Sequence, residues 1–470
     1  MAVFCRHIIG ALRRLQRRVV VLPLILLAVV LAGAAHAQEL SAAERARLEA
    51  RKEALFQQML REPKNLDVAF DYANVSAKLG DNEAAVSALE RMLLFNPKLP
   101  RVQLELGALY FRMASYEISR TYFEEALAAN PPAEVRDRID TYLAQIAKLS
   151  ATNRFSGFVL FGAQYQSDAN VAPGSPIVNG PFPFPIFLTK QFVKRADVDF
   201  FATGTSVYSY DLGTQTRDTL EVGGTGYVNH YGSVTRLDLG IVEATAGPRF
   251  NFIAPAPWLA HASLKPYLIA NDVSLGGDQY FHTLGVGGEA TALAWKDIRI
   301  KSIFEFRNKN FNDAPDRPLS RGLSGSDKLV SVFLSKPIDI VPQSDLSLEF
   351  DFLDQDTRLP FLSNKTYSVA AAYHVRYDDP TGRLHFPWET TVFGGRSWAN
   401  YEAPDPCRCN DSQTFADRFD RRWRFGLTQS FQVSDNVAVV VQLQRDIVSS
   451  NLSLYRYTSN SVLAGPQIRF

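Results

Sequence analysis

Charged side chains of both signs recur at every second position in parts of this chain. In 298–307, Arg299, Lys301, Glu305 and Arg307 alternate with apolar residues. Successive side chains of a β-strand point to opposite faces, so these charges share one face. A soluble sandwich or closed soluble barrel fills its inner face with apolar side chains instead. The pattern predicts electrostatic chemistry in a wet lumen, with the apolar face meeting lipid.

Covalent chemistry has no recognisable motif in this sequence. It contains no G-x-S-x-G, no H-E-x-x-H and no Gly-rich phosphate loop. The histidines at positions 230, 261, 282, 374 and 385 lie singly, and single histidines are more often structural than catalytic. We therefore expect no enzyme activity and no cofactor.

Cys407 and Cys409 form a C-R-C pair near the C-terminal end of the chain. In an oxidising compartment this pair could close a small, strained disulfide ring. Two cysteines are too few ligands for a zinc site. Cys407 and Cys409 are therefore a candidate disulfide, and no metal site is expected.

The first 37 residues have the pattern of a signal peptide. A segment with five arginines precedes an apolar run at 19–32, and Ala35-His36-Ala37 offers a small-x-small cleavage site. The alternative, an uncleaved anchor helix, is disfavoured by this site and by the polar segment after it. We expect 1–37 to be removed and 38–150 to begin the mature protein in the periplasm.

Removing 1–37 leaves 45 basic and 49 acidic residues, because that segment holds five arginines and no acid. A nearly balanced charge without a basic patch predicts no nucleic-acid partner. Past residue 40 no wholly apolar stretch is long enough to span a bilayer, so no further transmembrane helix is expected.

A helical repeat occupies 38–150. Pro63, Pro97 and Pro131 are evenly spaced, and their spacing is the period of tetratricopeptide repeats. The unit before Pro131 has the expected small and aromatic residues, except that Ser119 stands where alanine is usual. Stacked helix pairs form a groove that usually binds protein. The alternative is a structural spacer.

From 155 to 470 the hydrophobic period changes from helical to two. We count fourteen candidate strands, which predicts an antiparallel transmembrane β-barrel after the all-α solenoid. The connections 167–195, 309–326 and 401–417 are long and alternate with tight turns, as in barrels of the outer membrane. The exception is 249–263, a long connection where a short turn is expected. Either strands have been merged in this count or the segment has a role at the base of the barrel.

The connection 167–195 is rich in proline and unusually apolar for a surface loop. It could fold into the lumen as a plug or bind a client. The alternative is a rigid, proline-rich surface loop.

The segment 459–470 alternates between an apolar face that ends in Ile468 and Phe470 and a face of mostly small or polar residues. A strand ending in Phe resembles the closing strand of bacterial outer-membrane proteins, so Ile468 and Phe470 are a candidate signal for the barrel-assembly machinery. The alternative is an edge strand of a soluble sheet.

The order of signal peptide, tetratricopeptide repeats and barrel resembles the surface lipoprotein assembly modulator family, the type XI secretion translocators. Motif-level similarity covers 99–171: Leu99-Pro100-Arg101 opens it, Tyr122-Phe123-Glu124 follows, and Asp168-x-Asn170-Val171 ends it. The rest of the barrel is similar in architecture alone.

This resemblance implies that the protein moves a client protein from the periplasm to the cell surface. The repeat groove would receive the client or its chaperone, with Tyr122 helping to shape the groove. The barrel would be the path, through its lumen or through a seam between its first and last strands. Asp168 and Asn170 are further candidates for client binding.

Two other classes of function stay open at this stage. A simple diffusion porin with an accessory domain would conduct ions without a client. An exopolysaccharide export channel would also join a barrel to helical repeats, although such scaffolds usually have more repeats. All three readings place the chain in the outer membrane.

Overall fold

The structure is a computed structural model that describes residues 42–470, apart from gaps at 181–183, 257, 296, 339–340, 342, 383–385, 407–409, 411 and 413. The expected signal peptide, 1–37, and the expected disulfide of Cys407 and Cys409 lie outside the described residues. The chain divides into two compact units, Met1–Ala151 and Thr152–Phe470.

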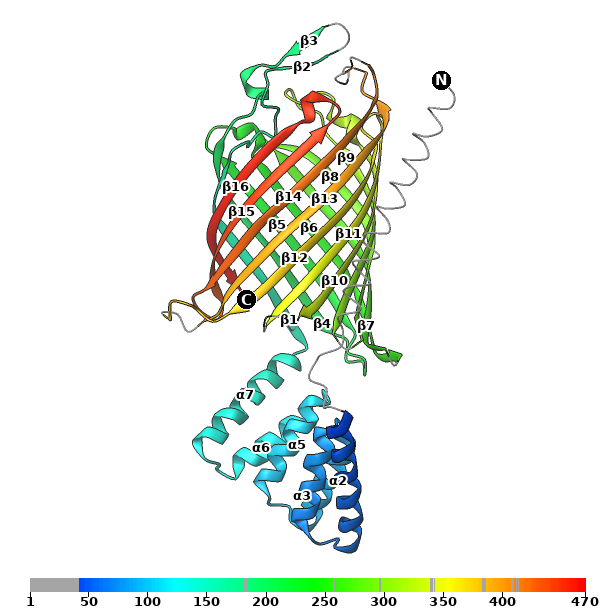
Figure 1. Cartoon of the computed structure of the whole chain (residues 1–470), viewed down its shortest axis with the longest axis vertical. Coiled ribbons are helices and arrows are strands. Elements are labelled where there is room, and N and C mark those ends of the chain that lie inside the picture. Colours follow the sequence, from blue (N-terminus) through cyan, green and yellow to red (C-terminus); the bar gives the residue numbers. More distant parts are fainter. Residues whose placement is uncertain are drawn as a thin grey trace. The chain divides into compact units, whose positions relative to one another are not determined.

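The first unit is helical (Figure 1). Its described helices are α2 (Ala42–Arg61), α3 (Leu66–Lys78), α4 (Asn82–Phe95), α5 (Pro100–Arg112), α6 (Tyr116–Ala128) and α7 (Ala133–Leu149). Pro63, Pro97 and Pro131 each follow the end of a helix, so their even spacing marks successive helix pairs. The tetratricopeptide-like architecture is confirmed. None of the described helices is both long and apolar enough to cross a membrane.

Local signals fix where these helices begin and end. The Asn65 carboxamide accepts a hydrogen bond from the Val68 amide at 3.3 Å, and Asp81 caps Ala84 in the same way at 3.1 Å. Gly80 has a φ of +81°, a left-handed conformation that glycine adopts without strain just after a helix. The turn between α3 and α4 is therefore set by its own residues.

Helices α5 and α6 pack closely against each other at Gly107. A Cβ atom at this position would lie 2.8 Å from the ring of Phe123, so a larger residue would force the ring or the helices to shift. Ser119 is buried opposite, and its hydroxyl donates a hydrogen bond to the Gly107 carbonyl at 2.7 Å. The serine that replaces the usual alanine thus satisfies its polar atom inside the pair.

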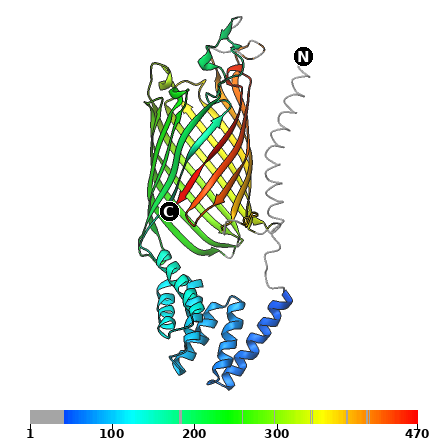
Figure 2. The same cartoon turned by 90° about the vertical axis from the view of Figure 1, so that its left-hand side faces the viewer.

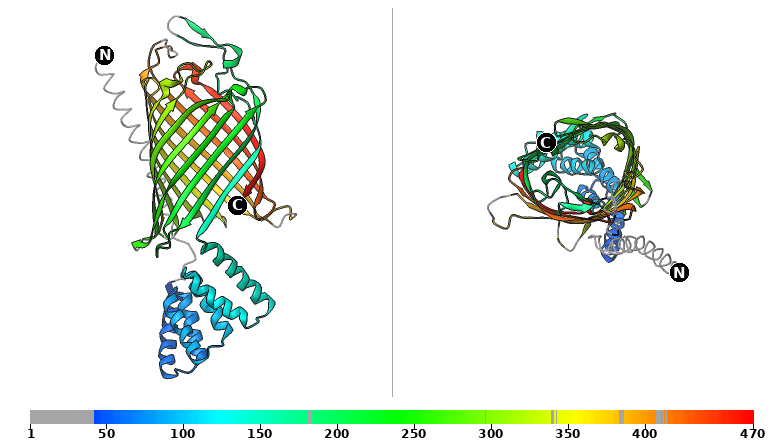
Figure 3. Two further views of the ribbon diagram at one scale, coloured as in Figure 1. Left: turned by 180° about the vertical axis from the view of Figure 1, so that it is seen from behind. Right: turned by 90° about the horizontal axis from the view of Figure 1, so that it is seen from above.

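The second unit is a closed antiparallel barrel of fourteen strands, as predicted. Each strand pairs with its neighbours in the chain, and β1 pairs with β16 to close the ring. Seen from above, the strands form a complete ring (Figure 3). The strands are β1 (Asn153–Gln166), β4 (Asp197–Asp211), β5 (Thr219–Tyr231), β6 (Leu239–Ala256), β7 (Leu259–Leu275), β8 (Asp278–Ala294), β9 (Ile298–Phe311), β10 (Gly325–Ile338), β11 (Ser344–Thr357), β12 (Asn364–Tyr377), β13 (Trp388–Pro404), β14 (Asp417–Gln432), β15 (Val437–Ser450) and β16 (Tyr457–Arg469).

The three longest connections between barrel strands, 167–196, 312–324 and 405–416, all lie at one end of the barrel. We call this the loop end, and the opposite end, with connections such as 295–297 and 433–436, the turn end. Because strands alternate in direction, the predicted alternation of long and tight connections follows from this topology.

The segment 249–263 is not a long connection, so that prediction is wrong. β6 and β7 continue through it as a ladder in which Phe250 pairs with Leu264 and Phe252 with Ala262. The register shifts between Ile253 and Ala256. Prolines at 255 and 257 suggested a loop, yet a proline near a strand end or an irregularity costs little pairing.

The connection 167–196 contains a small hairpin of β2 (Ile177–Asn179) and β3 (Pro185–Phe187). In Figure 1 this hairpin stands beyond the ends of the barrel strands. The Asn179 amide donates a hydrogen bond to the Ser453 hydroxyl at 3.0 Å, and Lys194 Nζ donates to the Thr458 carbonyl at 2.8 Å. These bonds fasten the connection to the loop end, and its hairpin lies outside the lumen.

Ion pairs that skip strands identify the inner face of the barrel. Arg307 Nη1 on β9 lies 2.9 Å from Glu243 Oε2 on β6, and Arg469 Nη2 on β16 lies 3.7 Å from Glu389 Oε2 on β13. Only the concave side of a closed sheet brings such distant strands together. The alternation of side chains then assigns every other position to the lumen.

The outer face carries the apolar positions. Val242, Leu268 and Leu284 are each about two thirds exposed. Aromatic side chains gather at its turn end, where Trp388 packs against Phe431 with 4.7 Å between ring centroids. An apolar belt bordered by aromatic side chains is the outer surface of a membrane-spanning barrel.

Candidate functional sites in the lumen, the helical groove and the closing seam

A chain of alternating charges crosses the lumen wall from β5 to β9. Arg249 joins Glu221 and Glu289, with 2.7 Å between the closest atoms in each pair. Lys265 Nζ lies 3.0 Å from Glu221, and Lys301 Nζ lies 3.2 Å from Glu289. Each of these charges has an opposite charge beside it, which offsets the cost of removing the buried ones from water. The charges on this part of the lumen wall are therefore paired with one another.

The four predicted lumen residues on β9 lie on the face that the alternation assigned to them. Lys301 joins the network through Glu289. Arg307 Nη2 lies 2.7 Å from Glu305 Oε2. Arg299 is exposed and forms no ion pair within the described residues. Whether these side chains contact a client or a solute stays a prediction.

A second lumen feature lies between β11 and β14, and the sequence did not single it out. A recess of about 360 Å³ has Glu349 on one side and Arg424 on the other. The register row that joins them runs through Ala370 and Gly395. Because these two residues are small, the wall is hollow between opposite charges. A run of small residues on the lumen face of adjacent strands is the signal that could have revealed this site.

The helical unit has a groove between α5 and α7 of about 510 Å³. Leu104, Val135 and Ile139 contribute apolar side chains to it, while Arg101 and Glu105 add a charge of each sign. The Arg101 guanidinium lies over the Phe70 ring of α3 at 4.7 Å, which holds this cation at the groove. Its size and apolar lining suit a segment of another chain.

Tyr122 is partly buried against the hydrophobic core of the helical unit and is not among the residues that line this groove. Its ring stacks on Tyr110, with 5.7 Å between centroids. The Tyr110 and Tyr122 hydroxyls both donate hydrogen bonds to Glu90 Oε1, at 2.6 and 3.4 Å. Burial, together with the neighbouring Glu90 carboxylate, raises the pKa of both tyrosines. A role for Tyr122 in client binding stays a prediction.

Asp168 and Asn170 shape the base of the connection 167–196. Asn170 donates a hydrogen bond to the Val193 carbonyl at 2.8 Å and accepts one from the Arg195 amide at 2.9 Å. Asp168 is fully buried, and its Oδ1 accepts a hydrogen bond from the Ala172 amide at 3.1 Å. The hydrogen bonds of these two residues fold the long connection back on itself. Their role in client binding stays a prediction.

Barrel closure brings Phe470 onto β1 (Figure 2). The Phe470 amide donates a hydrogen bond to the Gly157 carbonyl at 3.1 Å, and its ring stacks on Phe155 at 5.1 Å. Ile468 pairs with Val159 on β1. The proposed reading of Ile468 and Phe470 by the assembly machinery stays a prediction.

The closing pair of strands has a gap in its ladder. Partners run through Leu160 with Gln467 and resume at Ala163 with Ala464, omitting the positions that face Gly465 and Pro466. Proline has no amide hydrogen to donate. A Cβ atom on Gly465 would lie 2.0 Å from the Phe161 carbonyl oxygen, so the two backbones touch here. The seam between β1 and β16 is therefore held by fewer ladder hydrogen bonds at its middle.

Metal chemistry has no ready site in the described part of the chain. Within these residues no group of three His, Cys, Asp or Glu side chains is placed to hold a metal ion.

No protein-family model matches the chain, and no curated protein matches it. Among solved structures, a tetratricopeptide repeat protein from Parabacteroides merdae is 20% identical with a TM-score of 0.21, covering 22% of this chain and 40% of its own. An anion-selective porin from Comamonas acidovorans is 10% identical over 68% of this chain and 99% of its own, with a TM-score of 0.33. The outer membrane channel DcaP of Acinetobacter baumannii is 11% identical over 68% and 97%, with a TM-score of 0.34.

This chain thus spans less than half the length of the repeat protein that it resembles. Similarities this distant carry no functional argument. By its own strand pairing and helix order, the chain joins a tetratricopeptide-like unit to a closed, membrane-spanning β-barrel of fourteen strands.

Proposed function

We propose that this protein delivers a client protein from the periplasm to the cell surface, as its resemblance to the surface lipoprotein assembly modulator family implies. The helical groove receives the client or its periplasmic chaperone, and the barrel provides the path across the outer membrane. The groove between α5 and α7 is the observation that carries this proposal, because a channel for small solutes has no use for it.

The chemistry of the groove suits a polypeptide. Apolar side chains at Leu104 and Val135 offer a surface for the apolar residues of a client. Arg101 and Glu105 at the same groove can pair with charges of either sign, which gives orientation more than affinity. No covalent step is needed.

Chain connectivity supports coupling between recognition and transport. Only residues 150–152 separate the end of α7 from the start of β1, so a client held at α7 is close in sequence to the seam. The client leaves through the lumen or through the interrupted β1–β16 ladder. In this arrangement the helical unit lies in the periplasm and the loop end faces outside.

A surface-exposure assay tests the proposal. Candidate clients encoded beside this gene are co-expressed with it, and intact cells are probed with protease or antibody. We expect client exposure that depends on this protein and that is lost when Leu104→Arg places a charge in the groove. The matched control is Ile118→Arg, since Ile118 is 47% exposed on α6 and does not line the groove.

Unchanged client exposure with Leu104→Arg, in a barrel that still shifts on a gel when heated, would remove the groove from the mechanism. Exposure that does not depend on the protein at all would remove the translocator function.

A diffusion channel for charged solutes is the second candidate, because Glu349 and Arg424 flank a recess in the lumen wall. This function predicts steady ion conductance in a planar bilayer without any client. It also predicts that Arg424→Gln shifts the ion selectivity toward cations. A silent bilayer would exclude it.

A further inference from the structure

Three arginines on neighbouring strands point away from the lumen. They are Arg396 on β13, Arg421 on β14 and Arg445 on β15. Each alternates with a lumen position of its strand, since Glu389 and Asp446 form their ion pairs inside the barrel. Charges on the lipid face are costly near the middle of the membrane and cheap only near its surface. Three of them together call for an explanation.

Among the residues that the structure describes, no carboxylate pairs with any of these arginines. The Nε atom of Arg396 is buried and has no hydrogen-bond acceptor. Buried donors without acceptors are rare in folded proteins, so the Arg396 guanidinium keeps unused hydrogen-bonding capacity.

Two tryptophans hold the Arg396 guanidinium in place. It lies 4.9 Å from the Trp398 ring centroid and 4.6 Å from that of Trp423. Trp423 is the direct cross-strand partner of Arg396, so all three side chains share the outer face. A guanidinium stacked on aromatic rings can still donate in-plane hydrogen bonds to a phosphate through its Nη atoms.

The depth of this cluster matches the headgroup region of a membrane. Trp388 at the turn end and Trp398 near the loop end are ten residues apart on β13. With a rise of about 3.3 Å per residue and a strand tilt of about 40°, they are separated by roughly 25 Å along the barrel axis. This is the height of the apolar band between two aromatic girdles. The arginines therefore lie at the loop-end surface of the bilayer.

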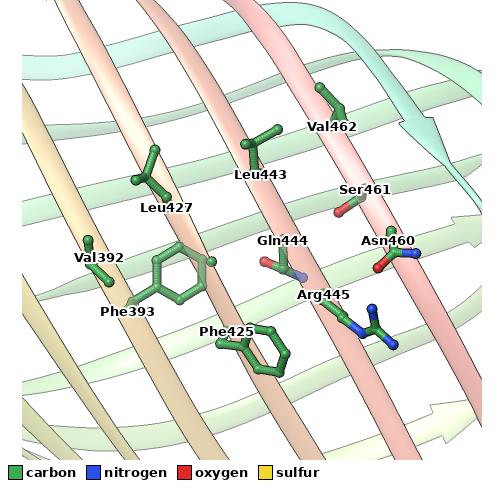
Figure 4. Close-up of a pocket in the computed structure, with 11 residues that line it drawn as sticks. Val392, Phe393, Phe425, Leu427, Leu443, Gln444, Arg445, Asn460, Ser461 and Val462 are labelled. Atoms are coloured by element: carbon green, nitrogen blue, oxygen red, sulfur yellow. The ribbon is translucent and has the colours of Figure 1, made fainter.

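An apolar groove begins at Arg445 and runs away from this surface. Figure 4 shows Arg445 and Asn460 at one end of the groove and Leu427, Leu443 and Val462 at the other. Its volume is about 440 Å³. From Arg445 to Leu443 the strand runs toward the turn end, which is the direction of the bilayer interior. The groove has the lining and the direction that a lipid acyl chain requires.

The spacing of the arginines indicates more than one phosphate. Arg396 and Arg421 are diagonal neighbours across β13 and β14, about 7–8 Å apart, and can converge on one phosphate. Arg445 is two strands and two residues from Arg396, which places their Cα atoms about 12 Å apart. A single phosphate cannot contact both.

We propose that the outer face of β13–β16 binds a lipid that carries two separated phosphates. Arg396 and Arg421 hold one phosphate, Arg445 holds the second, and an acyl chain lies along Leu443 and Val462. The bound lipid would fix the barrel in the leaflet at its loop end and cover the seam-side strands. This site does not depend on whether the barrel carries a client.

Native mass spectrometry of the full-length protein in detergent tests the site with three probes: diphosphoryl lipid A, monophosphoryl lipid A and phosphatidylcholine. We expect diphosphoryl lipid A to be retained longest, monophosphoryl lipid A less, and phosphatidylcholine least. Each of Arg396→Gln, Arg421→Gln and Arg445→Gln should weaken binding of the diphosphoryl probe about fivefold.

Lys365→Gln is the matched control. Lys365 is also an outward-facing cation of this region, but it is already paired with Glu402 at 3.2 Å. We expect this variant to bind like the unchanged protein, and all four variants to shift on a gel when heated, as folded barrels do. Equal retention of the three lipids, or a triple arginine variant that binds as tightly as Lys365→Gln, would overturn the proposal.

Discussion

Arg307 on β9 contacts Glu243 on β6 across the two strands that separate them, with 2.9 Å between Nη1 and Oε2. The same guanidinium lies 2.7 Å from Glu305 on its own strand. One side chain therefore ties together distant parts of the lumen wall.

Arg307→Met should destabilise the barrel, because it leaves Glu243 and Glu305 facing each other without a cation. We expect the free energy of unfolding to fall by roughly 2–3 kcal/mol. The fall is smaller than for a fully buried ion pair, because Arg307 and Glu243 are each about a fifth exposed. The measurement is the temperature at which the folded band disappears on a gel. Arg299→Met is the control, as Arg299 shares the strand and the face without an ion pair in the described residues; an equal shift in both variants would contradict this account.

Gly107→Ala should destabilise the helical unit. The new Cβ atom would lie 2.8 Å from the Phe123 ring, so α5 and α6 must separate, at a cost of about 1–3 kcal/mol. Thermal unfolding followed by far-UV circular dichroism at helical wavelengths measures this loss. Thr121→Ala on the exposed side of α6 should stay within about 0.5 kcal/mol of the unchanged protein.

The two stacked tyrosines should respond differently to loss of their hydroxyls. Tyr110→Phe removes a 2.6 Å hydrogen bond to a carboxylate and should cost about 1–2 kcal/mol. Tyr122→Phe removes only a 3.4 Å contact to the same Glu90 and should cost less than about 0.5 kcal/mol. If Tyr122→Phe keeps the unfolding temperature but lowers client export, the predicted binding role of Tyr122 gains support; unchanged export would leave it a packing residue.

The connection 167–196 should become more stable as the pH falls. Burial raises the pKa of Asp168 above its ordinary value, although the Ala172 amide and Lys194 act in the opposite direction. The folded connection therefore binds a proton more tightly than the unfolded one. Above the raised pKa, the folded connection carries the free-energy cost of a buried, ionised Asp168. This cost disappears as the pH falls through the raised pKa toward the ordinary pKa of an aspartate, near 4.

Protease cleavage of this connection in the intact barrel measures the effect, and cleavage should slow over that pH range. Asp168→Asn keeps an acceptor for the Ala172 amide and removes the charge, so it should flatten the dependence. A pH profile that is the same for Asp168→Asn would show that another group is responsible.

A disulfide across the closing seam distinguishes the two exits for a client. Ala163 and Ala464 are direct cross-strand partners, and such pairs lie within the distance that a disulfide spans. With both replaced by cysteine, and with Cys407 and Cys409 replaced by serine, oxidation should lock β1 to β16. Export that stops on oxidation and resumes on reduction indicates a lateral exit.

Export that continues through the locked seam would indicate passage through the lumen. Ala270 and Leu284 offer the control pair, since they join β7 to β8 in an uninterrupted part of the ladder. Oxidation of this pair should leave export unchanged for either exit.

Some features of the helical unit could be predicted from the sequence, because they depend on residues that are close together in the chain. An even repeat period, a proline after each helix pair and small residues at fixed offsets depend on contacts within one repeat. The Ser119 hydroxyl bond to Gly107 and the stacking of Tyr122 on Tyr110 could not be predicted from the sequence. Both depend on which way a side chain turns inside the packed unit.

In the segment 249–263, a local sequence signal led to a wrong prediction. Its prolines suggested a connection, although Phe250 and Phe252 alternate as strand residues do. Proline content is a local signal against strand pairing, but β6 pairs with β7 here in spite of it. The outward arginines were missed for a related reason, because no single strand shows that Arg396, Arg421 and Arg445 are neighbours.

The sequence alone determined the order of a helical repeat and a barrel and the face of each strand that meets the lumen, because the repeat period of the helices and the alternation of the strands are written in consecutive residues. The tertiary structure decided which residues meet: Arg307 with Glu243, Phe470 with Phe155, and Arg396 with Trp423. These contacts join strands that are far apart in the chain or depend on exact register, and a shift of one residue would turn each side chain to the other face.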